Sequence, residues 1–348
     1  MSKTGAKVIS ATSRQWIHSR IGYMLFLLAL AVVLLICALI AVSVGVVGGG
    51  IRELSEVMLR LNSSTRISQI MLDMRLPRVV AACITGAAFA LAGTVMQGIT
   101  RNPLADAGLL GINAGACFVV AFCTAFFPAL SYNGLMGAAF LGAAMAALMV
   151  YGFGVKNRKA DPLRLLLAGS AVSAFLTALS QGISIAFAFS KNLSFYTAGS
   201  LSGILWPQVK VVIPWLMAAG IAGLMLSGKL SILALGDESA VSLGVNVGIV
   251  RALSLLTVLV LAGVSVSLVG GISFIGIIVP HVARRLVGSD YRRIAPAAML
   301  LGAVLLVLSD VAARMLQAPF DTPTGALVSV IGVPVFLLLT YGNGRARL

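Results

Sequence analysis

The sequence has few charged residues and very few acidic ones. Charged residues make up 10% of the chain, with 10 Asp and Glu against 25 Lys and Arg, whereas 59% of the residues are hydrophobic. Because a soluble domain averages roughly 25% charged residues, this composition indicates an integral membrane protein. The short alternating segments of a membrane β-barrel are absent, so we expect an all-α membrane protein.

Enzymatic motifs are missing as well. There is no G-x-x-x-x-G-K-[ST] loop, which excludes ATP binding of the P-loop kind, and no H-E-x-x-H or G-x-S-x-G motif. The two histidines, His18 and His281, are far apart and have no ligand cluster, and the four cysteines lack metal-ligand spacing. The cysteines are therefore interpreted as packing residues. We expect no catalytic residue, no metal and no cofactor in this chain.

Long apolar runs dominate what is present, and each predicts a spanning helix of about 20 residues. About ten such runs occur, near 21–47, 79–99, 109–127, 134–154, 165–189, 211–226, 253–269, 272–287, 294–315 and 325–341. Gly and Ala are scattered through nearly all of them, and small residues let helices approach closely in a membrane. The sequence predicts one transmembrane domain, 1–348, with a short N-terminal tail at 1–20.

The spans divide the basic residues unevenly. Ten spans put both termini on one side, which holds 17 of the 25 Lys and Arg, while the other side holds eight. By the positive-inside rule, the termini and the segment 231–250 are expected in the cytoplasm. The basic excess therefore reports topology and does not predict nucleic-acid binding.

Five of the eight outward basic residues cluster between Arg52 and Arg78, where the positive-inside rule disfavours them. A solvated loop or contact with lipid headgroups would explain this cluster. A docking surface for an acidic external partner would explain it too, and the sequence leaves both interpretations open.

A short polar segment separates the sixth and seventh apolar runs. It consists of Leu235, Gly236, Asp237, Glu238, Ser239, Ala240, Val241, Ser242, Leu243 and Gly244. Its acidic start suits a helix N-terminus, its final glycine suits a helix stop, and Ala240, Val241 and Leu243 would form a small apolar face. We predict a brief helix that contacts a soluble partner, although an ordinary interhelical loop fits the pattern equally well.

Ionisable residues within the spans are almost limited to Asp310 and Arg314, four apart on one helical face. A proton- or sodium-coupled transporter normally needs carboxylates near the bilayer midplane, so we interpret this pair as structural. Its isolation argues against a secondary transporter. The simplest account is that a separate chain supplies energy through the segment 235–244.

Two prolines predict breaks in the helices. Asn102 and Pro103 are predicted as the N-cap and first position of the third span. Pro280 lies in a short span that follows Gly270 and Gly271, and it removes a backbone donor. This second region is a candidate gate or hinge, or equally a matter of helix packing.

Several motifs together resemble the FecCD-type permease subunits of ABC importers for iron–siderophore, haem and vitamin B12, over nearly the whole chain. The matching stretches are Arg75–Arg78, Gln97, Arg101–Gly111, Gly271–Gly276, Pro280 and His281, Asp310 and Arg314, and Pro323, Gly325, Gly332 and Pro334. Asp237 beside Glu238 is a small departure from the family's expected pattern.

The resemblance implies a type II ABC importer permease fold. It also implies that the segment 235–244 is a coupling helix, seated in a groove of a cytoplasmic ATPase. Arg75, Arg78 and Arg314 are implied to meet acidic residues of an extracytoplasmic binding protein; for Arg75 and Arg78 the alternative is snorkelling at a span boundary.

The function implied is the membrane-spanning half of an ATP-driven importer that carries a ferric siderophore through the bacterial cytoplasmic membrane. Expected partners are two ATPase subunits that bind ATP and Mg²⁺, a second permease, identical or paralogous, the binding protein and membrane lipid. A mostly apolar pathway is expected between the two permeases. Import of cobalamin or haem is the alternative, and a secondary transporter is a less favoured one.

Overall fold

The computed structural model describes residues 19–45, 66–156, 159–160, 162–318 and 320–344. The predicted tail at 1–20 therefore lies almost entirely outside the described residues, as do Arg52 and Arg60 of the outward basic cluster. The elements are α2 (Arg20–Ser43), α4 (Arg66–Ile70), the π-helix η1 (Met71–Arg75), α5 (Leu76–Thr100), the 3-10 helix η2 (Ala107–Leu110), α6 (Ile112–Phe126), α7 (Tyr132–Gly154), β1 (Val155–Lys156), β2 (Lys159–Ala160), α8 (Pro162–Ala186), α9 (Ser190–Thr197), α10 (Trp206–Leu233), α11 (Asp237–Ser242), α12 (Val247–Val269), α13 (Ile275–Val287), α14 (Tyr291–Leu316) and α15 (Thr324–Gly344).

Helices account for nearly all regular structure, and each predicted span overlaps one of them. In the part of the chain that the structure describes, the antiparallel pair β1 and β2 is the one regular element that is not helical. Among the described residues, seven helices are long and apolar enough to cross a membrane, and two shorter apolar helices cover 112–126 and 324–338. The remaining predicted span falls on α13, which has only 13 residues. The all-helical membrane fold is confirmed, and the count of ten spans stays a prediction.

The helix α5 runs through the centre of the bundle and packs along α14, α12, α10 and α13. Glycine pairs permit this packing, because a Cβ added at Gly93 would lie 2.0 Å from the Gly276 carbonyl oxygen. A Cβ added at Gly86 would lie 2.5 Å from the Gly302 oxygen. These backbones approach more closely than any side chain would permit, as small residues allow in membrane bundles.

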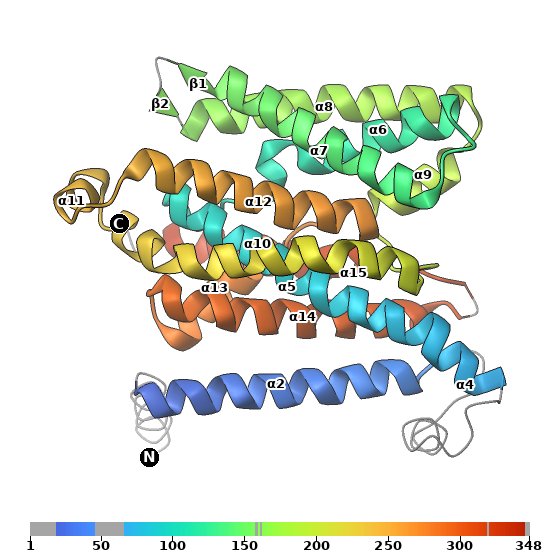
Figure 1. Ribbon diagram of the computed structural model, residues 1–348, viewed down its shortest axis with the longest axis horizontal. Coiled ribbons are helices and arrows are strands. Elements are labelled where there is room, and N and C mark those ends of the chain that lie inside the picture. Colours follow the sequence, from blue (N-terminus) through green and yellow to red (C-terminus); the bar gives the residue numbers. More distant parts are fainter. Residues whose placement is uncertain (1–18, 46–65, 157–158, 161, 319, 345–348) are drawn as a thin grey trace.

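The bundle has two ends, which we call the α11 end and the Arg78 end. At the α11 end, Tyr23 near the start of α2 donates to the Arg293 carbonyl at 2.9 Å, and Ser231 near the end of α10 donates to Asp290 at 2.7 Å. At the opposite end, Arg78 opens α5 and lies near the last turn of α14. In Figure 1, α2 starts on the side where α11 lies and runs to the other end.

One helix and a group of four flank α5 and the helices packed around it on opposite sides (Figure 1). The helix α2 packs on α14, whereas α6, α7, α8 and α9 pack on one another at the far side. The helix α8 is less covered than α7, since only 28% of its most apolar window, within Leu167–Ala186, is buried against 39% for α7. One face of α8 is therefore open in the single chain.

The prediction that Asn102 and Pro103 begin the third span is wrong. The helix α6 starts at Ile112, after η2, and Gly111 precedes it with φ of 71°. The Asn102 side chain accepts from the Leu104 N–H at 3.0 Å, and its carbonyl accepts from Ala105 at 3.1 Å. Asn side chains form such local turns in competition with helix, so Asn102 starts a turn after α5 instead of capping a helix.

Candidate functional site

The polar segment between α10 and α12 does form a short helix at one end of the bundle. Gly236 precedes α11 with φ of 124°, and Gly244 follows it with φ of 77°. Both values lie in the region that glycine adopts without steric cost. The residues that sequence reasoning assigned to the two helix ends therefore stand at those ends, with Glu238 exposed in the first turn.

The apolar side chains of α11 and its flanks do not share one face. Ala240 is fully buried, whereas Leu235, Val241 and Leu243 are between 61% and 69% exposed. Ser239 and Ser242 lie between them, and the Ser242 hydroxyl bonds within the helix to the Glu238 carbonyl. Within this segment, the Ala240 side chain is buried against the rest of the chain, whereas three larger apolar side chains are exposed.

Asp237 connects α11 to the rest of the bundle. Its carboxylate is held by Arg251 of α12 at 3.0 Å and by Arg101, the residue that ends α5. Arg101 adopts φ of 51° and also donates to the Leu233 carbonyl at 2.9 Å. Arg101 opens the loop 101–106, so displacement of α11 would act directly on this loop.

Three arginines meet at the Arg78 end, and their guanidinium groups point inward. Arg75, Arg78 and Arg314 are each less than 10% exposed. Arg75 donates to the Val42 and Ser43 carbonyls at the end of α2, at 3.2 and 3.1 Å. Arg314 likewise donates to carbonyls of α2 and the residue after it. Arg75 and Arg314 therefore bind the chain's own backbone, Arg78 binds two carboxylates, and none of the three is a freely exposed rim charge.

Asp310 is the central carboxylate of this group. It is 1% exposed, accepts hydrogen bonds from the Arg78 Nε at 3.0 and 3.2 Å, and forms an ion pair with the Arg314 Nε at 3.2 Å. Thr324 adds a hydrogen bond at 3.3 Å. The second acid, Asp321, binds Arg78 at 3.3 Å and is 34% exposed. The Asp310–Arg314 pair expected from the sequence thus belongs to a larger buried network.

A cleft of about 400 Å³ opens beside this network. It is lined by the three arginines together with Asp321 and the 202–205 turn. Three cationic groups face one carboxylate in the lining, so the cleft keeps a positive excess even though each guanidinium has partners. Such a cleft suits an acidic side chain that enters from outside the chain.

The predicted break around Gly270 and Gly271 lies between α12 and α13. Gly270 has φ of 73°, and a Cβ there would lie 2.1 Å from the Tyr196 carbonyl oxygen. The chain then re-enters the bundle, because α13 begins beside Gly93 in the middle of α5. Pro280 lies inside α13. The glycines thus precede a helix, α13, that starts inside the bundle and has only 13 residues, fewer than the roughly 20 that span a membrane.

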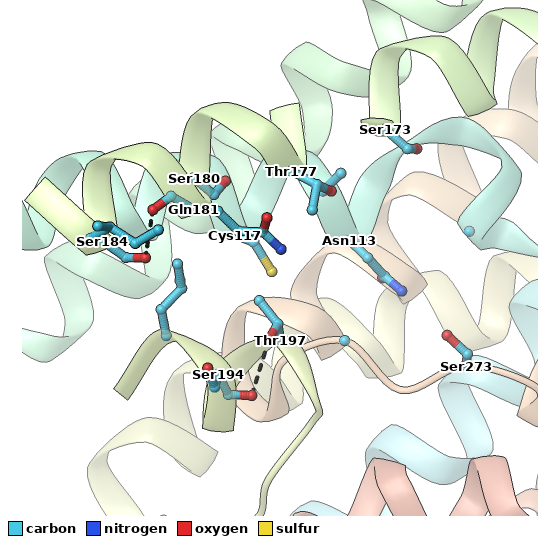
Figure 2. A pocket seen from close by; sticks show the side chains of 15 residues that line it. Asn113, Cys117, Ser173, Thr177, Ser180, Gln181, Ser184, Ser194, Thr197 and Ser273 are labelled. Carbon is cyan, nitrogen blue, oxygen red and sulfur yellow. Dashed lines mark hydrogen bonds between the residues drawn. The ribbon is translucent and has the colours of Figure 1, made fainter. Parts of the chain in front are cut away.

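A cavity of about 510 Å³ lies among α6, α8, α9 and the loop after α12. Figure 2 shows its polar side chains gathered around one space. The lining residues are Gly108, Asn113, Ala114, Cys117, Ser173, Thr177, Ser180, Gln181, Ser184, Ile185, Leu193, Ser194, Thr197, Gly271 and Ser273. Hydroxyl and amide groups predominate, and none of these lining residues carries a carboxylate, guanidinium, ammonium or imidazole group. The cavity is thus more polar than the apolar pathway expected from the sequence.

The hydrogen bonds of the lining leave polar groups free to face the cavity. Ser180 and Ser184 donate to carbonyls of their own helix at 2.7 and 2.9 Å, which leaves their oxygen lone pairs as acceptors. The side-chain amides of Asn113 and Gln181 and the hydroxyl of Thr177 make no hydrogen bond within the part of the chain that the structure describes. The cavity therefore offers both donors and acceptors.

Sequence reasoning did not single out these cavity residues, although a signal was present. Within the predicted span 165–189, polar residues recur at Ser173, Thr177, Ser180 and Ser184, three or four positions apart. That spacing places them on one face of a helix. A polar stripe on a spanning helix needs water or protein beside it, so the stripe could have identified α8 as a helix that does not face lipid there.

Comparison with known families covers most of the chain. Residues 30–341 match the FecCD transport family. The chain is 41% identical over 336 residues to the iron(3+)-hydroxamate import system permease protein FhuB of Bacillus subtilis, an alignment that covers 95% of this chain and 86% of that protein. It is 36% identical to the hemin transport system permease protein HmuU of Yersinia pestis, with 95% of this chain and 99% of that protein covered.

A solved structure supports the same relationship. An inward-facing metal-chelate type ABC transporter matches with a TM-score of 0.78 and 28% identity, covering 91% of this chain and 99% of that chain. The fold is therefore that of an ABC transporter permease, as expected from the sequence.

Proposed function

Because the chain belongs to the FecCD transport family, we propose that it is the membrane-spanning permease of an ATP-driven importer of ferric siderophores. The observation that carries this proposal is an exposed helix at one end of an ion-poor bundle and an uncharged cavity nearer the other. Among the described residues, Asp310 is a carboxylate buried in a spanning helix, and its ion pairs with Arg78 and Arg314 make it a poor group for coupling transport to an ion gradient. The energy therefore comes from another chain, and this chain performs no chemistry on its cargo and holds no ATP or Mg²⁺.

The exposed side chains of α11 are the contact for the ATPase. Leu235, Val241 and Leu243 present an apolar surface of the kind that a groove in a partner covers. Closure of two ATPase subunits on ATP would push α11, and Asp237 would transmit that push to Arg101. The loop after Arg101 leads to Gly108 in the cavity wall, so movement at the ATPase reaches the pathway through packed elements.

The polar face of α8 suggests how the pathway is completed. Hydroxyl and amide groups on a spanning helix are unfavourable against lipid tails, and Thr177 and Gln181 of the cavity lining are exposed in the single chain. A second permease, identical or paralogous, would cover this face and enclose the pathway between the two chains. In this arrangement α11 and both termini face the cytoplasm of a bacterial cell, in agreement with the positive-inside rule.

The cleft at the Arg78 end would receive an external binding protein. Its positive excess attracts an acidic side chain, and such charges chiefly orient a partner and speed association. Arg75→Gln should weaken docking of the binding protein to the purified complex, and docking to the unsubstituted protein should fall as salt rises from about 0.05 to 0.5 M. Lys210→Gln, outside the cleft lining, is the matched control. Docking that Arg75→Gln leaves unchanged would return Arg75 to a structural role.

Transport into vesicles tests the proposed function. The permease, its ATPase and its binding protein are reconstituted, and uptake of radioactive iron as a ferric trihydroxamate is followed. We expect uptake that requires ATP, stops when the P-loop lysine of the ATPase is replaced, and persists with a protonophore. Uptake that survives loss of the ATPase and collapses with the protonophore would identify a secondary transporter instead.

A further inference from the structure

The cavity of α6, α8 and α9 has a chemical character that bears on its cargo. Its described lining combines amides, hydroxyls and one thiol with the apolar side chains of Ala114, Ile185 and Leu193, and it contains no guanidinium, ammonium, imidazole or carboxylate. Pathways that conduct anions normally carry Arg or Lys rings that offset the lost hydration of the anion. A polyanion that entered this cavity would lose water without meeting a countercharge, which is costly in a low-dielectric setting.

A flat apolar ligand would leave the polar groups of this lining without partners. Asn113, Thr177 and Gln181 offer side-chain donors and acceptors that no neighbour satisfies within the described chain, and the bonded Ser180 and Ser184 offer acceptor lone pairs. Ligand sites gain orientation from a few convergent polar groups. This lining therefore matches a cargo whose periphery carries amides, carbonyls and hydroxyls.

We propose that this cavity accepts an electrically neutral, amide-rich ferric chelate of the trihydroxamate class and discriminates against polyanionic chelates and haem. Three singly charged hydroxamates neutralise Fe³⁺, so such a chelate has no net charge, whereas a tricatecholate is a trianion. Haem is a planar apolar ring with two carboxylates and fits the lining in neither respect. This inference rests on the proposed function, and it adds that the permease itself selects cargo by charge.

The test uses one chelate scaffold so that the binding protein is the same throughout. A ferric trihydroxamate is prepared in two forms that differ only at the periphery, with a neutral amide or with carboxylates. The affinity of each form for the binding protein is measured separately, and vesicle uptake is compared with the binding protein saturated. We expect the carboxylate form to enter at least about tenfold more slowly than the neutral form. An unpaired charge in a membrane interior raises the free-energy barrier by more than the amount that slows a rate tenfold.

Substitutions at Gln181 assign the selection to this cavity. Gln181→Lys should raise the ratio of carboxylate-form to neutral-form uptake several-fold, and Gln181→Glu should lower it. Gln181→Met keeps the length without charge and should change both rates by the same factor. Rates are expressed per inserted complex, and Thr177→Lys serves as a second cationic variant if Gln181→Lys does not insert.

Each outcome decides a different point. Equal uptake of the two forms at saturation, or equal effects of Lys and Glu at position 181, would overturn selection by charge while leaving the importer intact. Failure of every chelate to enter, with ATP hydrolysis intact, would overturn the proposed function itself.

Discussion

The side-chain amide of Gln97 donates to the carbonyl of Gly276, 3.1 Å away, and so satisfies a group that its own helix leaves unbonded. In an α-helix that carbonyl accepts from the residue four positions later, which here is Pro280 and has no N–H. Gln97 is 1% exposed, and its side-chain oxygen accepts from Arg284 at 3.3 Å. One side chain of α5 thus holds both the start and the end of α13.

Replacing Gln97 should therefore destabilise the bundle at α13. Gln97→Met keeps the length of the side chain but leaves the Gly276 carbonyl buried without a donor. An unsatisfied buried group costs about 1–3 kcal/mol, and we expect a loss of that size. Thermal unfolding of the purified permease in detergent measures it.

Pro280→Ala provides the matching control, because alanine restores the backbone N–H that Gly276 lacks. In the Gln97→Met background it should recover much of the lost stability, whereas alone it should do little. If the double variant unfolds as early as Gln97→Met, the Gly276 carbonyl is not the reason for the loss.

The two acids beside Arg78 should differ sharply in their effect on stability. Asp310→Asn leaves Arg78 and Arg314 near one another in a buried site, and breaking a buried pair costs on the order of 3 kcal/mol. Asp321→Asn removes a pair in which the acid is 34% exposed, so a loss below about 1 kcal/mol is expected. Unfolding in detergent and the amount inserted in membranes compare the two variants. Equal losses would contradict the central role of Asp310.

Sequence patterns predicted the helices well because a membrane makes hydrophobicity the dominant signal. They failed at Asn102, where a local hydrogen bond of the side chain outweighs the helix preference of Pro103. They also misjudged the exposure of Arg75, whose acceptors lie on α2 at Val42 and Ser43, far away in the sequence. Burial by a distant helix leaves no trace in local spacing.

Among the candidate sites, too, those formed by local sequence could be predicted and those assembled from distant segments could not. The short helix α11 could be predicted because local residues mark both of its ends: Asp237 and Glu238 in its first turn and Gly244 after its last residue. The cavity needs three helices and a loop, and only the polar stripe on α8 was visible beforehand. The ion pairs of Asp237 are made with Arg101 at the end of α5 and with Arg251 of α12. No sequence pattern around residue 237 predicts these pairs.

Asp237→Asn should uncouple ATP hydrolysis from transport without unfolding the chain. Its carboxylate is 45% exposed, and exposed ion pairs contribute no more than about 1 kcal/mol. The link from α11 to Arg101 is weakened, so we expect continued hydrolysis with several-fold less chelate moved per ATP. Uptake and phosphate release measured on the same vesicles give this ratio.

Glu238→Lys separates transmission from docking, because Glu238 is exposed and lies beside the apolar surface of α11. This variant should bind the ATPase more weakly, whereas Asp237→Asn should keep it bound. Normal transport in both variants would count against α11 as the coupling element.

Thiol accessibility should distinguish the two faces of α8. In a background without the four native cysteines, Thr177→Cys places a thiol in the cavity, and Phe175→Cys places one on the exposed apolar face. A thiolate forms in water far more readily than in hydrocarbon. A membrane-impermeant thiol reagent should therefore label position 177 in the assembled complex and label position 175 at least about tenfold more slowly. Bound chelate should slow the labelling at position 177. Equal labelling at both positions would mean that the polar face of α8 does not line the pathway.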